Sequence, residues 1–247
     1  MAKTDIIFGI HAVHSLLEHQ PHQILEIVVQ IGRDDKRIDE LLNYAHQHQI
    51  AVSEAKRKHL DELSQQANHQ GVVAKCKLKK PLGDNELLSW LEAEKQPPFL
   101  LILDTVTDPH NLGACLRSAE AAGVHGVIAP KDKSVGLTPA VRKVASGAAE
   151  IIPFYQVTNL ARTIRTLKER GVFIVGTLLN DEATSLYDTD LKGALAIVMG
   201  AEGQGMRRLT IEHCDVLAYI PIVGQVESLN VSVATGVCLF EALRQRL

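Results

Sequence analysis

A polar segment at residues 104–117 joins the end of an apolar run to a stretch with helical spacing, and it ends in the cation Arg117. Arg117 lies among small and apolar residues, where a cation needs a partner, and a phosphate is one candidate. Asn111 lies six residues earlier, a rotation equivalent to about 240° on a helix, so the two share a face only if Asn111 precedes the helix. A purely structural interpretation stays open, in which Asp108 or Asn111 caps the helix and Pro109 fixes the turn.

A second candidate segment, residues 197–206, ends an apolar run in three glycines within six residues. Glycine lets a backbone approach a ligand closely, so Gly200 is a candidate for a binding turn. Glu202, inside this turn, is well placed to accept hydrogen bonds. The turn lacks the Gly-Lys-Ser/Thr ending of a Walker A loop and the glycine order of a dinucleotide fingerprint. An ordinary turn is the structural alternative.

The third segment, residues 220–236, leads into the last helical stretch of the chain. We expect Ser228 to be the N-cap of that helix. Asn230, Ser232 and Thr235 then lie in a helix of small residues, against which another backbone can pack closely. A tightly packed C-terminal helix without a catalytic role is the structural alternative.

Five apolar runs and four helical stretches must position these segments. The strands are expected at 99–103, 124–129, 172–177, 195–199 and 216–222, and the helices at 112–122, 139–146, 160–170 and 229–246. This alternation predicts a mostly parallel sheet with helices on both faces. Ligands bind outside the carboxyl ends of the strands in such sheets, which is where the candidate segments begin.

The N-terminal part of the chain reads as a smaller α/β unit with the order α-β-α-β-α-β. Its helices are expected at 9–18, 35–48 and 56–63, and its strands at 24–31, 50–52 and 71–78. A lysine-rich and then proline-containing stretch follows, which is typical of a linker and has room for a short helix at 85–94. We therefore place the domains at 1–79 and 99–247, with a linker at 80–98.

Composition limits the class of protein. The chain has 247 residues, 46% hydrophobic and 22% charged, as expected of a folded globular protein. The four cysteines form no CxxC pair, so we expect free thiols in a reducing cytoplasm and no metal site. No run is long enough to span a bilayer. The net charge of −3 means that any contact with nucleic acid must come from local basic patches.

Taken together and in this order, the three segments resemble the SpoU (TrmH) branch of the SPOUT methyltransferases. The pattern is Asn111 with Arg117, then Met199-Gly200-Ala-Glu202-Gly, then Ser228-Leu229-Asn230-Val-Ser232. The resemblance covers residues 99–247. Residues 8–13 also look like the start of the substrate-binding domain of many members, which is similar to the ribosomal protein L30e fold.

The resemblance implies an α/β fold, with a trefoil-knotted C-terminal SPOUT methyltransferase domain and a small N-terminal L30e-like substrate-binding domain. It implies a homodimer with its active site at the subunit interface. It also implies that S-adenosylmethionine is the methyl donor, that no metal takes part, and that the backbones around four residues cradle the donor's adenosyl group. These residues are Thr177, Gly200, Ile220 and Leu229.

The implied reaction is attack of an RNA ribose 2′-hydroxyl on the sulfonium methyl group. We expect Arg117 to bind the target phosphate and to stabilise the developing oxyanion, because a guanidinium group is a poor base. The residues expected to orient Arg117 and the ribose are Asn111, Glu202, Ser228 and Asn230. The chemical identity of the general base is not given by the sequence.

Within the family, the chain is most similar to enzymes that methylate a guanosine in the peptidyl-transferase (P-loop) region of 23S rRNA. Such a substrate is either naked rRNA or a ribosome assembly intermediate. The alternatives are a relative acting on another rRNA or tRNA position, an inactive RNA-binding relative, and an unrelated nucleotide-binding domain. RNA would be selected by the N-terminal domain, whose basic clusters are Arg33, Lys36 and Arg37, and Lys56, Arg57 and Lys58. A solvated surface is their structural alternative, since acidic residues are interspersed.

Overall fold

The computed structural model describes residues 4–33, 35–77, 81–180, 182–201, 203 and 205–247. The chain divides into two compact units. The first unit comprises Met1–Lys80 and Leu137–Ile151, and the second comprises Pro81–Gly136 and Ile152–Leu247.

The first unit is built on a four-stranded mixed sheet with the order β1-β4-β2-β3. Only β2 and β3 pair in parallel, and β4 is antiparallel to both β1 and β2. Its core is aliphatic, and Val13, Leu16 and Ile27 are among its fully buried residues. The strands are β1 (Asp5–Phe8), β2 (Ile24–Gln30), β3 (Ala51–Ala55) and β4 (Val72–Cys76), and the helices are α1 (Ile10–His19), α2 (Lys36–Gln47) and α3 (Arg57–Leu63).

All six elements expected in this part of the chain are present, with ends shifted by a few residues. The sequence interpretation missed β1, which has four residues and pairs with β4 across a long separation in sequence. A strand of this length shows too little alternation to be recognised from its own residues.

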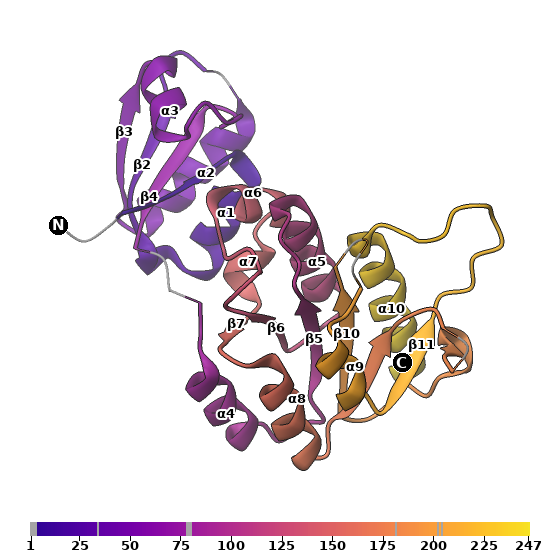
Figure 1. The fold of residues 1–247 in the computed structure, drawn as a ribbon. Coiled ribbons are helices and arrows are strands. Elements are labelled where there is room, and N and C mark those ends of the chain that lie inside the picture. The colour runs from indigo at the N-terminus through magenta and orange to yellow at the C-terminus, as the bar shows by residue number, and fades with distance from the viewer. Residues whose placement is uncertain (1–3, 34, 78–80, 181, 202, 204) are drawn as a thin grey trace. The chain divides into compact units, whose positions relative to one another are not determined.

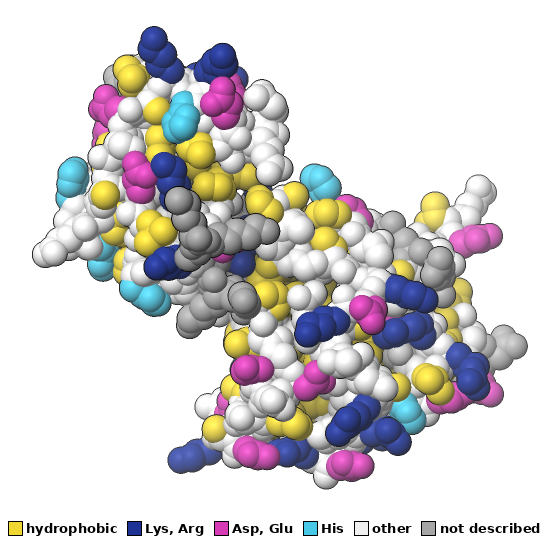
Figure 2. Space-filling view, turned by 60° about the vertical axis from the view of Figure 1, so that its left-hand side comes forward, with side chains coloured by type: hydrophobic (Ala, Val, Ile, Leu, Met, Phe, Trp, Pro, Cys, Tyr) yellow, Lys and Arg dark blue, Asp and Glu magenta, His cyan; other side chains and the backbone are white. Residues whose placement is uncertain are grey.

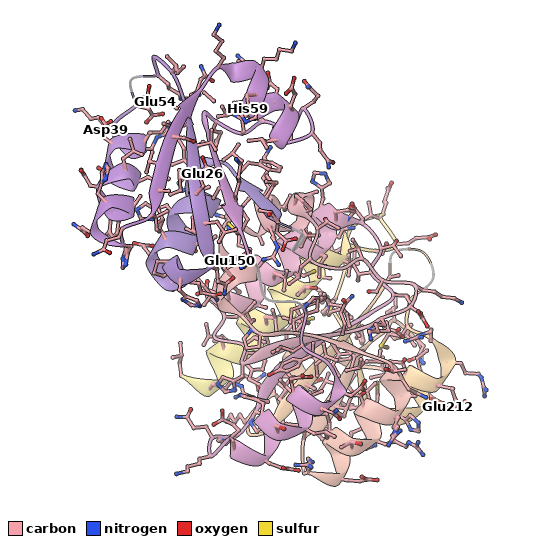
Figure 3. The ribbon with its side chains drawn as sticks, turned by 90° about the vertical axis from the view of Figure 1, so that its left-hand side faces the viewer. Glu26, Asp39, Glu54, His59, Glu150 and Glu212 are labelled. Atoms are coloured by element: carbon pink, nitrogen blue, oxygen red, sulfur yellow. The ribbon has the colours of Figure 1, made fainter. Side chains whose placement is uncertain are left out.

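Two helices from the middle of the chain, α6 (Pro139–Ala145) and α7 (Ala148–Ile151), complete the first unit. Between them Gly147 has φ 97°, and a side chain there would collide with Ser15 of α1. Arg142 of α6 and Glu150 of α7 form an ion pair and are both almost fully buried (Figure 3). The sequence predicts the helix at 139–146 correctly, but its spacing cannot show which of the two units it packs on.

The second unit contains a seven-stranded sheet with the order β7-β6-β5-β10-β8-β11-β9 (Figure 1). Every neighbouring pair is parallel, which confirms the predicted sheet type. The strands are β5 (Phe99–Asp104), β6 (Gly126–Pro130), β7 (Phe154–Val157), β8 (Phe173–Thr177), β9 (Thr184–Ser185), β10 (Leu195–Gly200) and β11 (Val216–Tyr219).

Helices cover both faces of this sheet. On one face α4 (Asp84–Ala93), α8 (Leu160–Glu169) and α9 (Arg208–His213) pack in one apolar cluster with the strands. On the other face lie α5 (Pro109–Ala121) and α10 (Val231–Arg246), which pack on each other. The helix expected at 85–94 is α4. The sequence interpretation missed α7, α9, β7 and β9, all of which have six residues or fewer.

Within the described ranges, no helix is both long and apolar enough to cross a membrane. The trefoil knot that the sequence resemblance implies stays a prediction.

Candidate functional site

The carboxyl ends of β8, β10 and β11 surround a cavity of about 390 Å³ in the second unit. Ser228 lines this cavity. So do all four residues that are expected to cradle a methyl donor, namely Thr177, Gly200, Ile220 and Leu229. The other described lining residues are glycine, aliphatic residues and Tyr219, apart from the single charged side chain, Glu227. The wall is therefore mainly neutral and apolar, and the cavity lies at the strand ends, where ligands bind in parallel sheets.

The glycines of the second segment shape one wall of this cavity. A Cβ on Gly200 would lie 2.3 Å from the carbonyl carbon of Gly205 and 2.4 Å from the nitrogen of Met206. The chain folds back here because Ala201 and Gly205 exchange backbone hydrogen bonds of 3.1 and 2.9 Å. Gly203 and Gly205 both have positive φ, which glycine adopts without strain. The turn therefore needs glycine for its own geometry and also for the close approach at the cavity wall.

A buried carboxylate, Asp104, fixes the end of this turn. Asp104 pairs with Gly200 in the parallel register of β5 and β10, and its side chain is fully buried. It accepts hydrogen bonds from the backbone nitrogen of Arg207 at 2.9 Å and from Nε of Arg207 at 2.7 Å. The next residue, Thr105, has φ 65°, which is rare for a β-branched residue and stores strain next to the site.

The sequence interpretation gave Asp104 no role. The available signal was a single carboxylate at the end of an otherwise apolar strand, because a buried charge requires a partner. That partner could not be found from spacing, since Arg207 lies 103 residues further along the chain.

Asn111 and Asn230 lie together where α5 meets α10. Nδ2 of Asn230 donates to Oδ1 of Asn111 at 2.9 Å. Asn230 is also the N-cap of α10, since its Oδ1 accepts from the backbone nitrogen of Ser232. The prediction that Ser228 caps this helix is therefore wrong. Serine and asparagine cap helices equally well, so residue type alone could not separate positions 228 and 230.

The α5 and α10 helices pack closely because their contact residues are small. Sγ of Cys115 lies 3.4 Å from Oγ1 of Thr235, and Oγ of Ser118 is the nearest atom to the space above Gly236. This confirms that the small residues of the last helix admit another backbone. Asp108, not Asn111, is the N-cap of α5, and its side chain accepts from the backbone nitrogen of His110.

Arg117 lies on the exposed side of α5. It makes no hydrogen bond or ion pair with the residues that the structure describes, and it does not line the cavity. Arg117 therefore has no partner in the described part of its own chain, and a phosphate stays the predicted partner. One copy of the chain thus brings the expected cofactor residues together at the cavity and joins Asn111 to Asn230, while Asn111, Asn230 and Arg117 are not among the lining residues. Glu202 lies outside the described residues.

All four cysteines are free, as expected. Burial raises the pKa of the Cys115 thiol to about 11 and that of Cys238 to about 12. Burial also raises the pKa values of Cys76 and Cys214 to about 12. These thiols stay protonated at neutral pH, so they are poor nucleophiles and poor metal ligands.

The charged side chains of one face of the molecule are of both signs (Figure 2). On the side of the molecule that Figure 2 shows, lysine and arginine side chains alternate with aspartate and glutamate. This agrees with the net charge of −3 and leaves local clusters as the sites for a polyanion.

Two family profiles match the sequence, and together they cover most of both units. The sequence profile of the SpoU rRNA Methylase family matches residues 98–240. A second profile, described as RNA 2′-O ribose methyltransferase substrate binding, matches residues 6–82.

Full-length relatives share more than half of their residues with this chain. The 23S rRNA (guanosine-2′-O-)-methyltransferase RlmB of Shewanella oneidensis is 58% identical over 246 residues, which cover 100% of this chain and 99% of that protein. RlmB of Escherichia coli K12 is 54% identical over 243 residues, covering 98% and 99%. The fold also matches the crystal structure of an AdoMet-bound rRNA methyltransferase from Sinorhizobium meliloti, with a TM-score of 0.79, 24% identity and coverage of 99% and 88%.

Proposed function

Because the chain belongs to the SpoU rRNA methylase family, we propose that it methylates the ribose 2′-hydroxyl of a guanosine in 23S rRNA. One structural observation supports this most strongly: four residues from three separate parts of the chain, Thr177, Gly200, Ile220 and Leu229, converge on one cavity at the strand ends. The reaction and the substrate are those named for the full-length relatives. We place the target guanosine in the peptidyl-transferase (P-loop) region and the enzyme in the cytoplasm.

The cavity fits S-adenosylmethionine as the methyl donor. Its wall offers backbone groups to an adenosyl moiety, and the absence of a side chain at Gly200 lets the backbone of Gly205 and Met206 pack closely against that wall. Glu227, its only charged described lining residue, can face the cationic part of the donor. When bound, S-adenosylmethionine supplies an activated methyl group on a sulfonium, which an oxygen nucleophile can attack.

We assign the phosphate-binding role to Arg117. An exposed guanidinium without a partner in the described part of its own chain is free to bind the phosphate beside the target ribose. A guanidinium group keeps its proton in proteins, so Arg117 would stabilise the developing oxyanion and would not act as the base. Asn111 and Asn230, joined by their hydrogen bond, would orient the ribose together with Ser228 and Glu202.

We infer a homodimer in which the partner copy supplies Arg117 to the cavity. Arg117 does not line the cavity of its own chain. Val233 and Phe240, seven residues apart on α10, are 53% and 49% exposed, which leaves an apolar stripe on that helix. A second copy of the chain would cover this stripe and complete the site.

Replacing Arg117 tests the proposed function. We expect Arg117→Ala to lower methyl transfer to 23S rRNA by at least about 100-fold, because an oxyanion-stabilising donor is lost. The affinity for S-adenosylmethionine, measured by calorimetry, should be unchanged. Arg165→Ala, which removes another exposed arginine from α8, is the control and should retain activity. Normal turnover of Arg117→Ala would contradict the assignment.

Two further experiments separate the parts of this proposal. Mixing equal amounts of Arg117→Ala and Gly200→Val chains should restore about one quarter of the wild-type rate if Arg117 acts across a dimer, since half of the dimers are mixed and each has one complete site. No recovery would place Arg117 in its own chain's site. If the side chain at 117 acts as the base, Arg117→Lys should shift the rise of the pH–rate profile towards lower pH, because lysine has a lower pKa than arginine. The same profile as wild type would contradict a base role.

A further inference from the structure

The first unit contains a second cavity, of about 270 Å³, which brings its two basic clusters together. Arg33 follows β2, and Arg57 is the first residue of α3, the helix that also carries His59 in Figure 3. Both arginines line this cavity although they are 24 residues apart in sequence. If the basic clusters were only part of a solvated surface, the two arginines would not need to lie at the same cavity. The lining is almost entirely polar, and it lies outside the site described above.

A hydrogen bond between the buried His69 and the partly exposed Asp61 joins two lining residues of this cavity. The His69 side chain is 5% exposed, and its Nδ1 accepts a hydrogen bond from the backbone nitrogen of Gly71 at 3.0 Å. That bond leaves the proton on Nε2, which donates to Oδ1 of Asp61 at 3.1 Å. The other oxygen, Oδ2, lies 3.8 Å from Nε of Arg57. His69 therefore orients Asp61, whose carboxylate lies near the exposed guanidinium of Arg57.

The loop that forms one wall, residues 64–71, is rigidly held and strained. Gln65, Gln66 and Gln70 all have φ between 53° and 64°, a conformation that few non-glycine residues adopt. The backbone nitrogen of Gln66 donates to the carbonyl oxygen of Asp61 at 2.7 Å, and Oε1 of Gln70 accepts from the backbone nitrogen of Ile10 at 3.0 Å. Strained backbone that the surroundings hold in place is concentrated at binding sites.

The chemistry of the lining matches one class of ligand. Guanidinium groups bind phosphate and stack on the faces of bases, and amide side chains form paired hydrogen bonds with base edges. The cavity offers two guanidinium groups together with the amide side chains of Gln30, Gln66 and Asn68. In duplex RNA the major groove is too deep and narrow for side chains to read, so such groups are used on bases that are splayed out of a helix.

We propose that this cavity binds one unpaired nucleotide of the substrate RNA, with its base against the amide side chains and its phosphate on Arg33 and Arg57. The proposal rests on the proposed function in that the ligand is the RNA to be methylated. The cavity would select the RNA by an unpaired nucleotide, while the cavity of the second unit holds the methyl donor. The two sites would then contribute separately to affinity and to turnover.

Removing both arginines tests this division. We expect the variant Arg33→Ala with Arg57→Ala to bind a 23S rRNA transcript on the order of tenfold more weakly in filter binding, since contacts to phosphate and base are lost. The affinity for S-adenosylmethionine and kcat at saturating RNA should stay at wild-type values. Arg162→Ala with Arg165→Ala, two exposed arginines of α8, removes the same charge and should bind normally. Equal weakening in both variants would overturn the proposal.

A conservative pair separates recognition from charge. Arg33→Lys with Arg57→Lys keeps both positive charges but loses the planar donors that pair with phosphate and stack on a base. We expect this variant to remain several-fold weaker than wild type at the same salt concentration. Complete recovery with lysine would show that only net charge matters, which would contradict a nucleotide-binding cavity.

Cross-linking locates the nucleotide directly. The native thiols are buried or half-buried with raised pKa values, so Gln66→Cys introduces a selectively reactive site at the cavity, to which a photoreactive azidophenacyl group can be attached. We expect cross-links at an unpaired position of the 23S rRNA transcript, mapped by reverse-transcription stops. Arg165→Cys, labelled in the same way, is the control. Cross-links within a duplex, or the same pattern as the control, would overturn the proposal.

Failure of this inference can be distinguished from failure of the proposed function. Binding and cross-linking require no methyl transfer. If the labelled Gln66→Cys protein cross-links through the cavity but the wild-type protein does not methylate 23S rRNA, the proposed function fails and the cavity remains an RNA site. If it methylates normally while the arginine pair has no effect on binding, only the cavity assignment fails.

Discussion

The two proposed binding cavities, one in each unit, are lined by different chemical groups. The cavity of the second unit is lined by backbone, glycine and aliphatic side chains, with Glu227 as its only charged described residue. The cavity of the first unit is lined by arginine, carboxylate, imidazole and amide groups. A wall of backbone recognises a ligand by shape and by fixed peptide groups, whereas a wall of side chains recognises it by charge and hydrogen bonding. The first should therefore be sensitive to added volume and the second to removed charge.

The largest expected effect comes from adding one methyl group to the backbone-lined cavity. In Gly200→Ala the new Cβ would lie 2.3 Å from a backbone carbon of Gly205, so the turn must shift. We expect the affinity for S-adenosylmethionine to fall by at least about 100-fold and the free energy of unfolding to fall by about 1–3 kcal/mol. Calorimetry and urea unfolding measure the two quantities.

A matched glycine provides the control. In Gly236→Ala the new Cβ would lie 3.8 Å from Oγ of Ser118, an ordinary contact, and inside a helix alanine is favoured over glycine by about 1 kcal/mol. This variant should bind the donor normally and be slightly more stable. If Gly200→Ala also binds normally, the cavity wall is not fixed by the close approach of backbones.

The next effect concerns Asp104, which fixes the end of the glycine turn at the wall of the second unit's cavity. Asp104→Asn removes the buried charge that accepts two hydrogen bonds from Arg207. We expect the free energy of unfolding to fall by about 2 kcal/mol, less than for a fully buried pair because the Arg207 side chain is 42% exposed. Affinity for the donor should fall as well, since the turn that follows Gly200 is released at one end.

A neighbouring surface pair tests whether burial is the cause. Arg208 pairs with Glu212 at 2.7 Å, but its side chain is 81% exposed. Arg208→Ala should cost less than about 0.5 kcal/mol and leave donor affinity unchanged. Equal losses for Asp104→Asn and Arg208→Ala would contradict the assigned role of Asp104.

The smallest expected effect is a loss of free energy of unfolding at alkaline pH, which should come mainly from the second unit. Three of the four cysteines, Cys115, Cys214 and Cys238, belong to the second unit, and burial raises the pKa of each to about 11 or 12. In the unfolded chain these thiols ionise near pH 8.5. Their stabilising contribution is therefore complete below that pH and is lost as the pH rises towards 11–12.

Each buried thiol should lower the free energy of unfolding by about 1 kcal/mol between pH 9 and pH 10. Urea unfolding of wild type and Cys115→Ala across this range measures the contribution of one thiol as a difference in slope. Identical slopes would show that the Cys115 thiol is not kept protonated by burial.

Most of the fold could be predicted from the sequence because its main elements are long and periodic. Strands such as β5 and β10 are continuous apolar runs, and α8 has clear helical spacing. Short elements such as β1 and β7, with four residues each, could not be recognised in this way. The packing of α6 and α7 on the first unit depends on contacts distant in sequence, such as that of Gly147 with Ser15, which local spacing does not record.

The candidate site could be predicted only as far as its residues lie at strand ends. The resemblance implied the cofactor residues Thr177, Gly200 and Ile220, and the predicted parallel sheet agrees with their convergence because they end or follow apolar runs. The pairing of Asp104 with Arg207, and of Asn111 with Asn230, joins residues more than a hundred positions apart. The cavity of the first unit was missed for the same reason, since only its basic clusters are visible in the sequence.

The central claim is tested most directly by mapping ribose methylation in rRNA from cells that lack this protein. We predict the loss of one 2′-O-methyl guanosine in the peptidyl-transferase region of 23S rRNA, with all other sites unchanged. Wild-type protein should restore the modification, and Arg117→Ala should not. An unaltered methylation pattern in the cells lacking the protein would contradict the account.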